Sequence, residues 1–273
     1  MSPFMRHIEA CNTARLPGQR RAFYAGAAHV GWVLPDLAEA LAEFGGIRIT
    51  PEGVRLDRPQ DLYGIARTLA EAGQFRFRGE AFDVRETADG PVLAQLDRGA
   101  LPRFGVISQG VHVNGLVRRD GATWLWVARR ALNKANDPGK LDHIVAGGIP
   151  AGLTPDETLI KEAAEEAAIP ASLAARAVQV GRIAYRMERP EGLRRDVLTC
   201  YDLDVPEDFT PHPADGEVEG FELWPIERAF AEVRDGNGFK FNVNLVLTGL
   251  FLRLGLIAGA EAEQVRAGLY RAG

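Results

Sequence analysis

Residues 146–170 read AGGIPAGLTPDETLIKEAAEEAAIP, and this stretch decides the fold because it places a glycine pair and a turn directly before a helix. Thr154 is a favoured N-cap and Pro155 suits the first helical position. Glu157 stands three residues after the cap and completes a capping box. The sequence therefore specifies where this helix begins.

Three glutamates, Glu162, Glu165 and Glu166, follow in this helix at i, i+3 and i+4, so their side chains project from the same side. Like charges at this spacing cost about 0.2 to 0.5 kcal/mol per pair. A solvated acidic face is one interpretation. The other is a site for a hard divalent cation, because Mg²⁺ binds carboxylate oxygens and bridges them to substrate phosphates. The spacing alone leaves both open.

The residue pattern of this stretch resembles the Nudix box, the signature of hydrolases that cleave nucleoside diphosphates linked to another group. The resemblance is carried by Gly147, Leu153, Lys161-Glu162-Ala163, Glu165-Glu166 and Ala168-Ile169. The family pattern has Glu at the place of Leu153, Arg at Lys161 and Gly at Ala168. The three glutamate positions that bind metal in the family are intact.

Four longer blocks resemble the two-domain Nudix branch that includes plant members and the region fused ahead of fungal thiamine pyrophosphokinase. They are residues 138–152, 158–170, 191–206 and 239–253. The resemblance implies a diphosphatase that depends on Mg²⁺, with Mn²⁺ as the alternative. It also implies a small-molecule diphosphate as partner: thiamine diphosphate, its oxidised forms or a nucleoside diphosphate derivative.

The same resemblance assigns candidate site residues. Glu162, Glu165 and Glu166 are the catalytic and metal-binding carboxylates, and a carbonyl of the glycine loop, from Gly147 or Gly148, is expected to join the coordination. Glu217 is the candidate for a further acid from a later loop, with Glu219 as runner-up, although a solvent-facing residue is the ordinary interpretation of either. The sequence does not single out which glutamate accepts the proton of the attacking water.

Positively charged and polar side chains are expected to hold the diphosphate, since arginine binds phosphate in a bidentate manner. Each is equally compatible with an ordinary surface residue, and the histidine with a satisfied, partly buried one. The candidates are Arg130 or Lys134, His143, Arg194, Arg195, Lys240 and Asn242.

The order of elements predicts an α+β protein of two domains. Residues 1–103 are expected to form a small α+β accessory domain, with a hairpin around TPEG and a helix over about residues 60–72. The order of strands and helices in residues 104–273 predicts a mixed sheet sandwiched by helices, and the resemblance implies that it is a Nudix-type α/β/α sandwich. Asp120-Gly121 predicts a tight hairpin, and a proline in residues 100–105 marks the boundary.

Composition excludes several classes of protein. The net charge of −5 offers no electrostatic footprint for nucleic acid or an anionic membrane. Cys11 and Cys200 lie far apart without metal-ligand spacing, which predicts two reduced thiols in a cytoplasmic protein. The start of the chain has no apolar signal segment, and Arg253 interrupts the greasy run at 245–260, so we expect a buried helix there. A homo-oligomer is compatible with this composition.

Two other functions fit the same fold. Leu153, Lys161 and Ala168 depart from the family pattern. These departures are compatible with a catalytically weak or inactive Nudix-fold protein that binds a ligand or has a regulatory role. The retention of three like charges argues against a pure binding module. An isomerase or transferase is a third alternative, which the sequence opposes only weakly.

Overall fold

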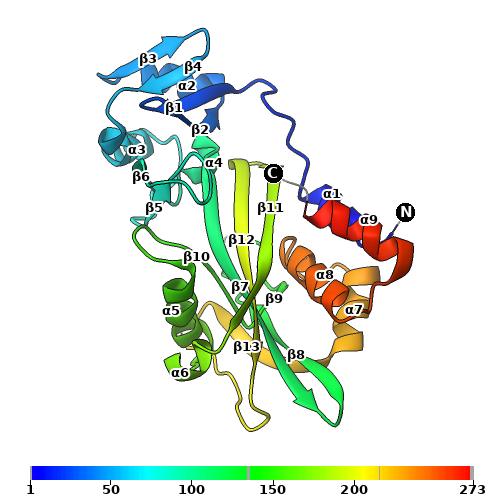
Figure 1. The fold of residues 1–273 in the computed structure, drawn as a ribbon. Coiled ribbons are helices and arrows are strands. Elements are labelled where there is room, and N and C mark those ends of the chain that lie inside the picture. Colours follow the sequence, from blue (N-terminus) through cyan, green and yellow to red (C-terminus); the bar gives the residue numbers. More distant parts are fainter. Residues whose placement is uncertain (1, 134–135, 215, 271–273) are drawn as a thin grey trace.

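The computed structural model describes residues 2–133, 136–214 and 216–270, and it arranges them around a four-stranded sheet, a seven-stranded sheet and a two-stranded hairpin (Figure 1). The first third of the chain builds a four-stranded sheet in the order β2-β1-β4-β3. Strand β1 pairs antiparallel with β2 and parallel with β4, and the hairpin predicted around TPEG is confirmed as β3 and β4. The bounds are β1 (Arg21–Ala25), β2 (Ala28–Val33), β3 (Ile47–Thr50) and β4 (Gly53–Leu56).

A short hairpin lies between this sheet and the rest of the molecule. It consists of β5 (Ala81–Val84) and β6 (Ala94–Asp97), which pair antiparallel. Phe82, Val84 and Leu96 from the hairpin share one buried core with the four-stranded sheet. The helices of the same core are α2 (Pro35–Ala42), α3 (Leu62–Glu71) and α4 (Leu101–Phe104), and a 3-10 turn (Pro59–Asp61) precedes α3.

The second sheet is mixed, as predicted. Its main path runs β11-β12-β7-β8-β13, while β10 pairs with β7 and β9 pairs with β8. Only the central β12–β7 pair is parallel among the pairs described in this sheet. The bounds are β7 (Ile107–Arg119), β8 (Ala122–Arg130), β9 (Leu141–Asp142), β10 (Val145–Gly148), β11 (Val178–Arg189), β12 (Gly192–Asp204) and β13 (Val218–Pro225).

Turn chemistry explains the long hairpin in this sheet. Asp120 and Gly121 connect β7 to β8 with φ values of 50° and 76°, the left-handed conformation that two-residue hairpin turns require. The turn therefore fixes the register in which Gly115 faces Trp126 and Arg119 faces Ala122. This register also carries β8 to the edge where β9 and β13 pair with it.

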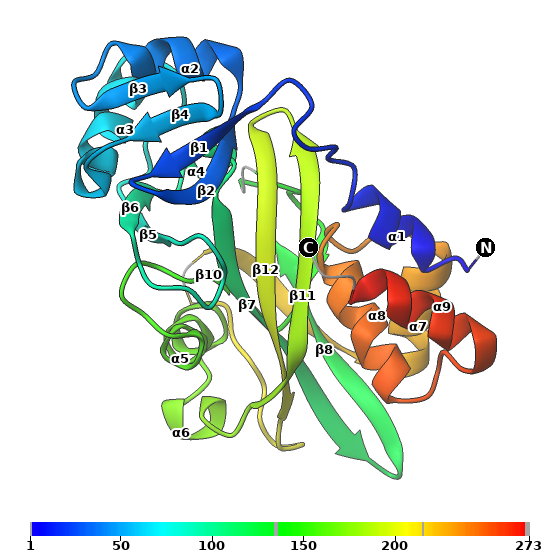
Figure 2. The ribbon, with the colours of Figure 1, turned by 45° about the horizontal axis from the view of Figure 1, so that its top comes forward.

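Helices cover both faces of the mixed sheet, which gives the predicted sandwich (Figure 2). Helices α5 (Pro155–Ala167) and α6 (Ala171–Ala174) pack on one face over Val111, Val113 and Tyr201. On the other face lie α7 (Ile226–Asp235), α8 (Val243–Arg253) and α9 (Gly259–Leu269). Residues 243–252 of α8 are all buried, as expected for the greasy segment. Within the described ranges, none of the helices has the length and apolar character needed to cross a membrane.

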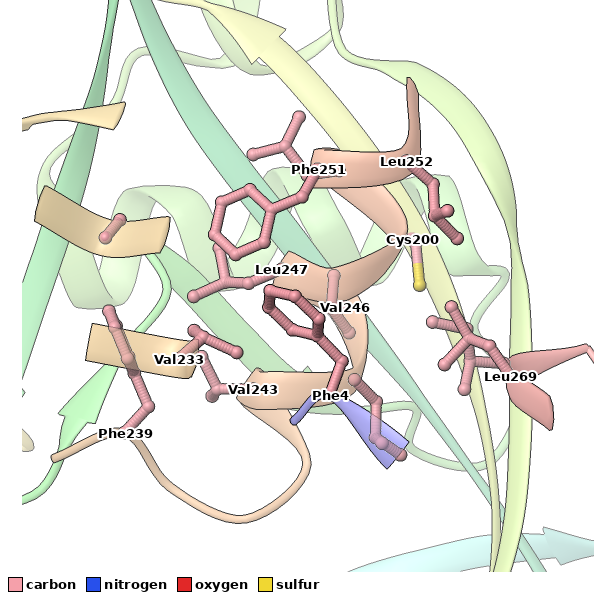
Figure 3. Close-up of a cluster of buried hydrophobic side chains, with 14 of the residues drawn as sticks. Phe4, Cys200, Val233, Phe239, Val243, Val246, Leu247, Phe251, Leu252 and Leu269 are labelled. Atoms are coloured by element: carbon pink, nitrogen blue, oxygen red, sulfur yellow. The ribbon is translucent and has the colours of Figure 1, made fainter. Parts of the chain in front are cut away.

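The first helix of the chain packs with the last ones. Helix α1 (Met5–Ala10) was not predicted, and it lies beside α8 and α9 (Figures 1 and 2). Phe4 contacts the ring of Phe251 at 6.3 Å between centroids, inside the cluster shown in Figure 3. Cys11 and Cys200 belong to the same cluster as free thiols, and burial raises the pKa of each to about 12.

A pair of matched substitutions tests this placement of α1. Ile8→Val should destabilise the C-terminal core by about 1 kcal/mol, because a buried methylene is lost from α1. Hydrogen exchange should then be faster at the amides of Val246 and Leu247 in α8. Ile65→Val removes the same group from α3 in the other core and is the control. Equal exchange of the α8 amides in both variants would contradict the assignment of α1 to the second core.

Candidate metal and phosphate site

Helix α5 begins and ends through identifiable local contacts. The Glu157 N–H donates to Thr154 Oγ1 at 3.2 Å, and the Thr154 N–H donates to Glu157 Oε2 at 2.9 Å, so the predicted capping box is confirmed. At the other end, Ala168 takes φ 53°. This left-handed conformation favours glycine and costs a residue with a Cβ about 1 kcal/mol. The helix thus keeps its register despite the departure at Ala168.

The three glutamates of α5 sit in three different environments. Glu166 is buried, Glu162 is half-buried with 17 % of its side chain exposed, and Glu165 is exposed. Lys161 forms ion pairs with both Glu162 and Glu165. Burial raises the pKa of Glu162, and the charges of Lys161 and Arg98 partly oppose that rise. Lys161 therefore neutralises the outer part of the acidic face.

Glu166 carries no such neutralising partner in the contacts described. Its Oε2 accepts the Ala146 N–H at 2.9 Å. Burial raises its pKa well above the usual value, the Ala146 hydrogen bond opposes this, and the charges of Asp142, Glu162 and Glu217 reinforce it. A buried carboxylate among other acids is stabilised either by a proton or by a cation. This is the environment that a bound metal ion would relieve.

The glycine pair lies in strand β10 beside the carboxylates. Gly147 and Gly148 pair with Val111 and Gly110 of β7. A Cβ on Gly147 would lie 2.5 Å from the Cγ and Cδ atoms of Glu162, so only glycine lets this side chain lie against the strand. Gly147 therefore lies directly against the Glu162 side chain, while its place opposite Val111 turns its carbonyl toward β7.

A small pocket opens where β9, β10 and β13 meet α5. Of the predicted site residues, it brings together Glu166, Glu217, His143 and Arg130; the Glu217 carbonyl also accepts the Ala131 N–H at 2.9 Å. Asp142, Ala146 and Val218 complete the lining. Glu219, the runner-up, accepts the Leu132 N–H through Oε1 at 3.3 Å. Lys134 lies outside the described residues.

Asp142 anchors two of the predicted cations at this pocket. Its Oδ2 accepts from Arg130 Nη1 at 2.7 Å and from Lys240 Nζ at 3.4 Å. Burial by itself would raise the pKa of Asp142, but Lys240 and Arg130 outweigh it and hold the pKa well below its usual value. Burial lowers the pKa of Lys240, and Asp142 opposes that shift. Arg130, which lines the pocket, and Lys240, which lies beside it, are thus both held by Asp142.

A buried chain of hydrogen bonds connects the pocket to the far end of the sheet. Arg194 Nε donates to Asp196, and the hydroxyl of Tyr185 donates to the same carboxylate. The Tyr185 oxygen in turn accepts from Asn242 Nδ2 at 3.4 Å. Since a carboxylate only accepts, these contacts fix the amide of Asn242 with its nitrogen facing Tyr185.

The amide of Asn242 determines which ring nitrogen carries the proton in two histidines. Asn242 Nδ2 lies 3.4 Å from His112 Nε2, so His112 carries its proton on Nδ1 and donates to His143 Nδ1 at 2.9 Å. Neutral His143 then carries its proton on Nε2, a buried atom for which no partner is found in the described part of the chain. His143 is thereby prepared as a hydrogen-bond donor beside the pocket.

The sequence analysis did not predict three members of this hydrogen-bonded chain, namely His112, Tyr185 and Asp196. His112 stands between Val111 and Val113 on β7, and Tyr185 shares the buried face of β11 with Ile183 and Met187, so their only signal is a polar group within a buried part of a strand. Asp196 directly follows the arginine pair. That a carboxylate lay opposite Tyr185 depended on the pairing of β11 with β12.

The two adjacent arginines do not act together. Arg194 pairs with Asp196 and lies over the Phe241 ring at 5.6 Å from its centroid. Arg195, which points to the opposite face of β12, donates to the carbonyls of Gly105 at 3.1 Å and Val30 at 3.4 Å. Neither lines the pocket.

One other cluster has the composition of a metal site. His112, Asp142 and His143 are the only His/Cys/Asp/Glu group of three or more, within residues 2–133, 136–214 and 216–270, whose ligand atoms all lie within 4.8 Å. Arg130 and Lys240 already contact Asp142, and the two Nδ1 atoms are bonded to each other. A divalent cation there would meet positive charge, so Glu162 and Glu166 fit a hard cation better.

The neutral burial of His143 predicts a dependence of stability on pH. Burial lowers its pKa to about 4, opposed by Asp142, so below about pH 6.5 unfolding takes up a proton that the folded state does not hold. Stability from this group is present at neutral pH and is lost as the pH falls. His143→Gln should therefore lose less stability than the parent between about pH 7 and pH 5 in urea unfolding. His212 is exposed, so His212→Gln is the control. If the parent and His143→Gln lost equal stability between about pH 7 and pH 5, the neutral burial of His143 would be contradicted.

Comparison with known proteins places this geometry in context. The family model described as "NUDIX domain" matches residues 108–243, and the one described as "Domain of unknown function (DUF4743)" matches residues 3–108. The chain is 41 % identical over 202 residues to the chloroplastic Nudix hydrolase 20 of Arabidopsis thaliana, which covers 74 % of this chain and 54 % of that protein. It thus spans about half the length of that relative.

A second relative is matched over more of its length. The chloroplastic Nudix hydrolase 24 of Arabidopsis thaliana is 34 % identical over 270 residues, covering 94 % of this chain and 74 % of that protein. Among solved structures, the NUDIX domain of Shewanella oneidensis NrtR, complexed with ADP ribose, is 14 % identical and has a TM-score of 0.44. That match covers 55 % of this chain and 90 % of the other.

Proposed function

Because this chain belongs to the Nudix hydrolase family, we propose that it is a metal-dependent diphosphatase that hydrolyses a phosphoanhydride bond. The observation that carries the proposal is Glu166, a buried carboxylate whose pKa is raised by burial beside further acids on the capped helix. The proposed ligands are Glu162, Glu165, Glu166, the carbonyl of Gly147 and Glu217. Mg²⁺ is the proposed ion, with Mn²⁺ as the alternative.

In the proposed mechanism, carboxylates hold the cation, and positively charged and hydrogen-bond-donating side chains hold the diphosphate. The bound cation supplies polarisation of the phosphoryl oxygens and a lowered pKa for the attacking water. Glu166 would be the acceptor of that water's proton, since it is the buried carboxylate of α5 that lines the pocket. Arg130 and Lys240, held by Asp142, offer positive charge to the diphosphate. His143 donates a hydrogen bond from Nε2 to a phosphoryl oxygen.

The other predicted binding residues act at a distance in this proposal. Asn242 sets the proton on the histidines, and Arg194 orients Asp196 at the start of the chain. Arg195 fixes residues at the junction with the first domain. We propose the division of domains at 103/104, with the qualification that α1 packs on the second domain. A cytoplasmic location is part of the same proposal.

Thiamine diphosphate and its oxidised forms are the first substrates to test, because of the resemblance to the region fused ahead of fungal thiamine pyrophosphokinase. The test is product release by the purified chain with Mg²⁺ or Mn²⁺, with ADP-ribose and dinucleotides as comparison substrates. Turnover of at least one diphosphate that stops on chelation is expected. A chain that hydrolyses none of them with either cation would overturn the diphosphatase proposal.

One observation favours a second candidate function, a ligand-binding or regulatory protein. Lys161 already neutralises Glu162 and Glu165, which weakens the attraction of these carboxylates for a cation. Chelation separates the two functions, since a regulator would bind the diphosphate equally well without the cation. Calorimetric titration of the diphosphate into the protein, with and without EDTA, measures this difference. Equal affinity in both conditions would support the ligand-binding or regulatory function.

A further inference from the structure

The β5–β6 hairpin of the first domain lies directly against the strand and loop that precede helix α5 (Figures 1 and 2). The Ala151 N–H donates to the carbonyl of Ala81 at 2.8 Å. The Gly152 N–H reaches Asp83 Oδ2 in a longer contact of 3.5 Å. Two successive backbone donors of the β10–α5 loop are thus satisfied by the first domain.

Phe82 provides the apolar part of this contact. Its ring is buried, and a Cβ on Gly148 would lie 2.8 Å from Phe82 Cζ. Successive residues of a strand face opposite sides, so Gly147 faces Glu162 while Gly148 faces Phe82. The glycine pair is therefore held between a proposed metal ligand on one side and an aromatic ring of the first domain on the other.

The hairpin itself is firmly fixed. The buried carboxylate of Asp97 accepts backbone N–H groups from Arg78, Gly79, Glu80 and Gly99, which fixes the approach to β5. Arg85 donates to Asp83 Oδ2 at 2.9 Å. Beyond the hairpin strands, the Ala88 carbonyl accepts from Gln109 Nε2 at 3.0 Å and Asp89 pairs with Arg182. Four polar contacts and the buried ring of Phe82 thus connect residues 81–89 to the second domain.

The loop has few other means of holding its shape. Leu153 is partly buried in the core under α5 and has no polar group to offer the loop. The Ile149 N–H donates to Gln109 and the Leu153 N–H to Pro150, so the hairpin supplies the remaining restraint on residues 150–152. Loss of that restraint would free the segment that joins Gly147 to the start of α5.

We propose that the β5–β6 hairpin positions the metal site, with Phe82 as the positioning residue that holds Gly148 and thereby the β10 backbone at Gly147, against which Glu162 lies. This rests on the proposed function for the identity of the ligands. The first domain is then a structural part of the active site. Residues that contact a metal ligand without binding the metal themselves typically change metal affinity by about 10- to 100-fold.

Hydrogen exchange tests the contact without relying on activity. In the whole metal-free protein, Phe82→Ala should speed exchange at the Ala151 and Gly152 amides by about tenfold or more, because these amides open locally when the hairpin releases them. Leu41→Ala leaves a cavity in the same core away from the loop and is the control for loss of domain stability. Equal acceleration in both variants, or none in Phe82→Ala, would overturn the proposal.

A second pair of variants covers the case in which Phe82→Ala fails to fold. Gly148→Ala should weaken Mn²⁺ binding, followed by electron paramagnetic resonance, by about tenfold. Adding Phe82→Leu, which removes Cζ, should restore most of that affinity. Gly64→Ala, whose added methyl meets open space, is the control. Failure of Phe82→Leu to restore Mn²⁺ binding in the Gly148→Ala background would overturn the role of Phe82.

These outcomes are separable from those of the proposed function. A chain that hydrolyses no diphosphate but shows the exchange and Mn²⁺ results would keep the positioning role and lose the hydrolase. A chain that hydrolyses a diphosphate but shows the same exchange in Phe82→Ala and the parent would keep the hydrolase and lose the positioning role.

Discussion

Replacing Glu166 with glutamine should lower kcat for metal-dependent diphosphate hydrolysis by about 10³-fold, the range expected for loss of a general base that also binds the cation. Glutamine keeps the size of the side chain, and its carbonyl oxygen still accepts the Ala146 N–H. The loss would therefore report on charge and proton transfer rather than on packing. Steady-state kinetics at saturating Mg²⁺ measure it, with exposed Glu261→Gln as the control.

The same substitution should stabilise the metal-free protein at neutral pH. A carboxyl group whose pKa is raised in the folded state gives stability that is present below its unfolded pKa of about 4.3 and is lost as the pH rises through its folded pKa. As the pH rises from about 4 toward 7, the parent therefore loses stability that Glu166→Gln keeps. The two proteins should become equally stable below about pH 4.

Added Mg²⁺ should reverse the order, because a ligand that binds only the folded state stabilises it. The parent should gain thermal stability with Mg²⁺, and Glu166→Gln should gain less. Lower activity together with lower stability in the metal-free state would point to a folding defect instead. Unchanged kcat would remove Glu166 from the proposed mechanism.

The sequence was informative where local chemistry determines structure. The start of α5 at Pro155 follows from its cap, and the β7–β8 turn follows from Asp120-Gly121. The mixed sheet and the buried helix α8 were likewise predicted from strand patterns and hydrophobic content. These features depend on contacts between residues that are near one another in the chain.

The sequence was uninformative where distant segments meet. Helix α1 is short, and only its packing against α8 and α9 explains why it forms where it does. The glycine pair was expected to let the backbone approach an ion, but Gly148 is constrained by Phe82, which is 66 residues away in the chain. The chain from Arg194 to His143 joins β12, β11, α8 and β7, and no spacing along the sequence encodes it.

Asp142→Asn should be the most destabilising polar substitution near the site, at about 3 to 5 kcal/mol, because it leaves buried cations without their counter-charge. Asp142 is 5 % exposed, and Oδ2 accepts from both Arg130 and Lys240. Asparagine can accept only weakly from one of them. Urea unfolding near neutral pH measures the loss, and a change below about 1 kcal/mol would contradict a charge-paired Asp142.

Lys240→Met provides the matched comparison. Burial lowers the pKa of Lys240, so its charge is already unfavourable there, and its removal leaves the 2.7 Å pair between Arg130 and Asp142 intact. This variant should lose about 1 kcal/mol or less. Combined with Asp142→Asn, it should recover part of the stability, because one of the two unpaired cations is then gone. Additive losses in the double variant would contradict direct coupling of the two side chains.

The pH dependence of stability provides an independent test of the charge pairing of Asp142. Asp142 has its pKa held below the usual value by Lys240 and Arg130 against the effect of burial, so its stabilisation is present above its unfolded pKa of about 3.9 and is lost below it. The difference between the parent and Asp142→Asn should therefore persist from neutral pH down to about pH 4 and shrink only in stronger acid. The difference in His143→Gln appears at milder pH, since it begins below the ordinary histidine pKa of about 6.5. The two sides of this pocket are thus distinguishable by the pH at which each contribution to stability disappears.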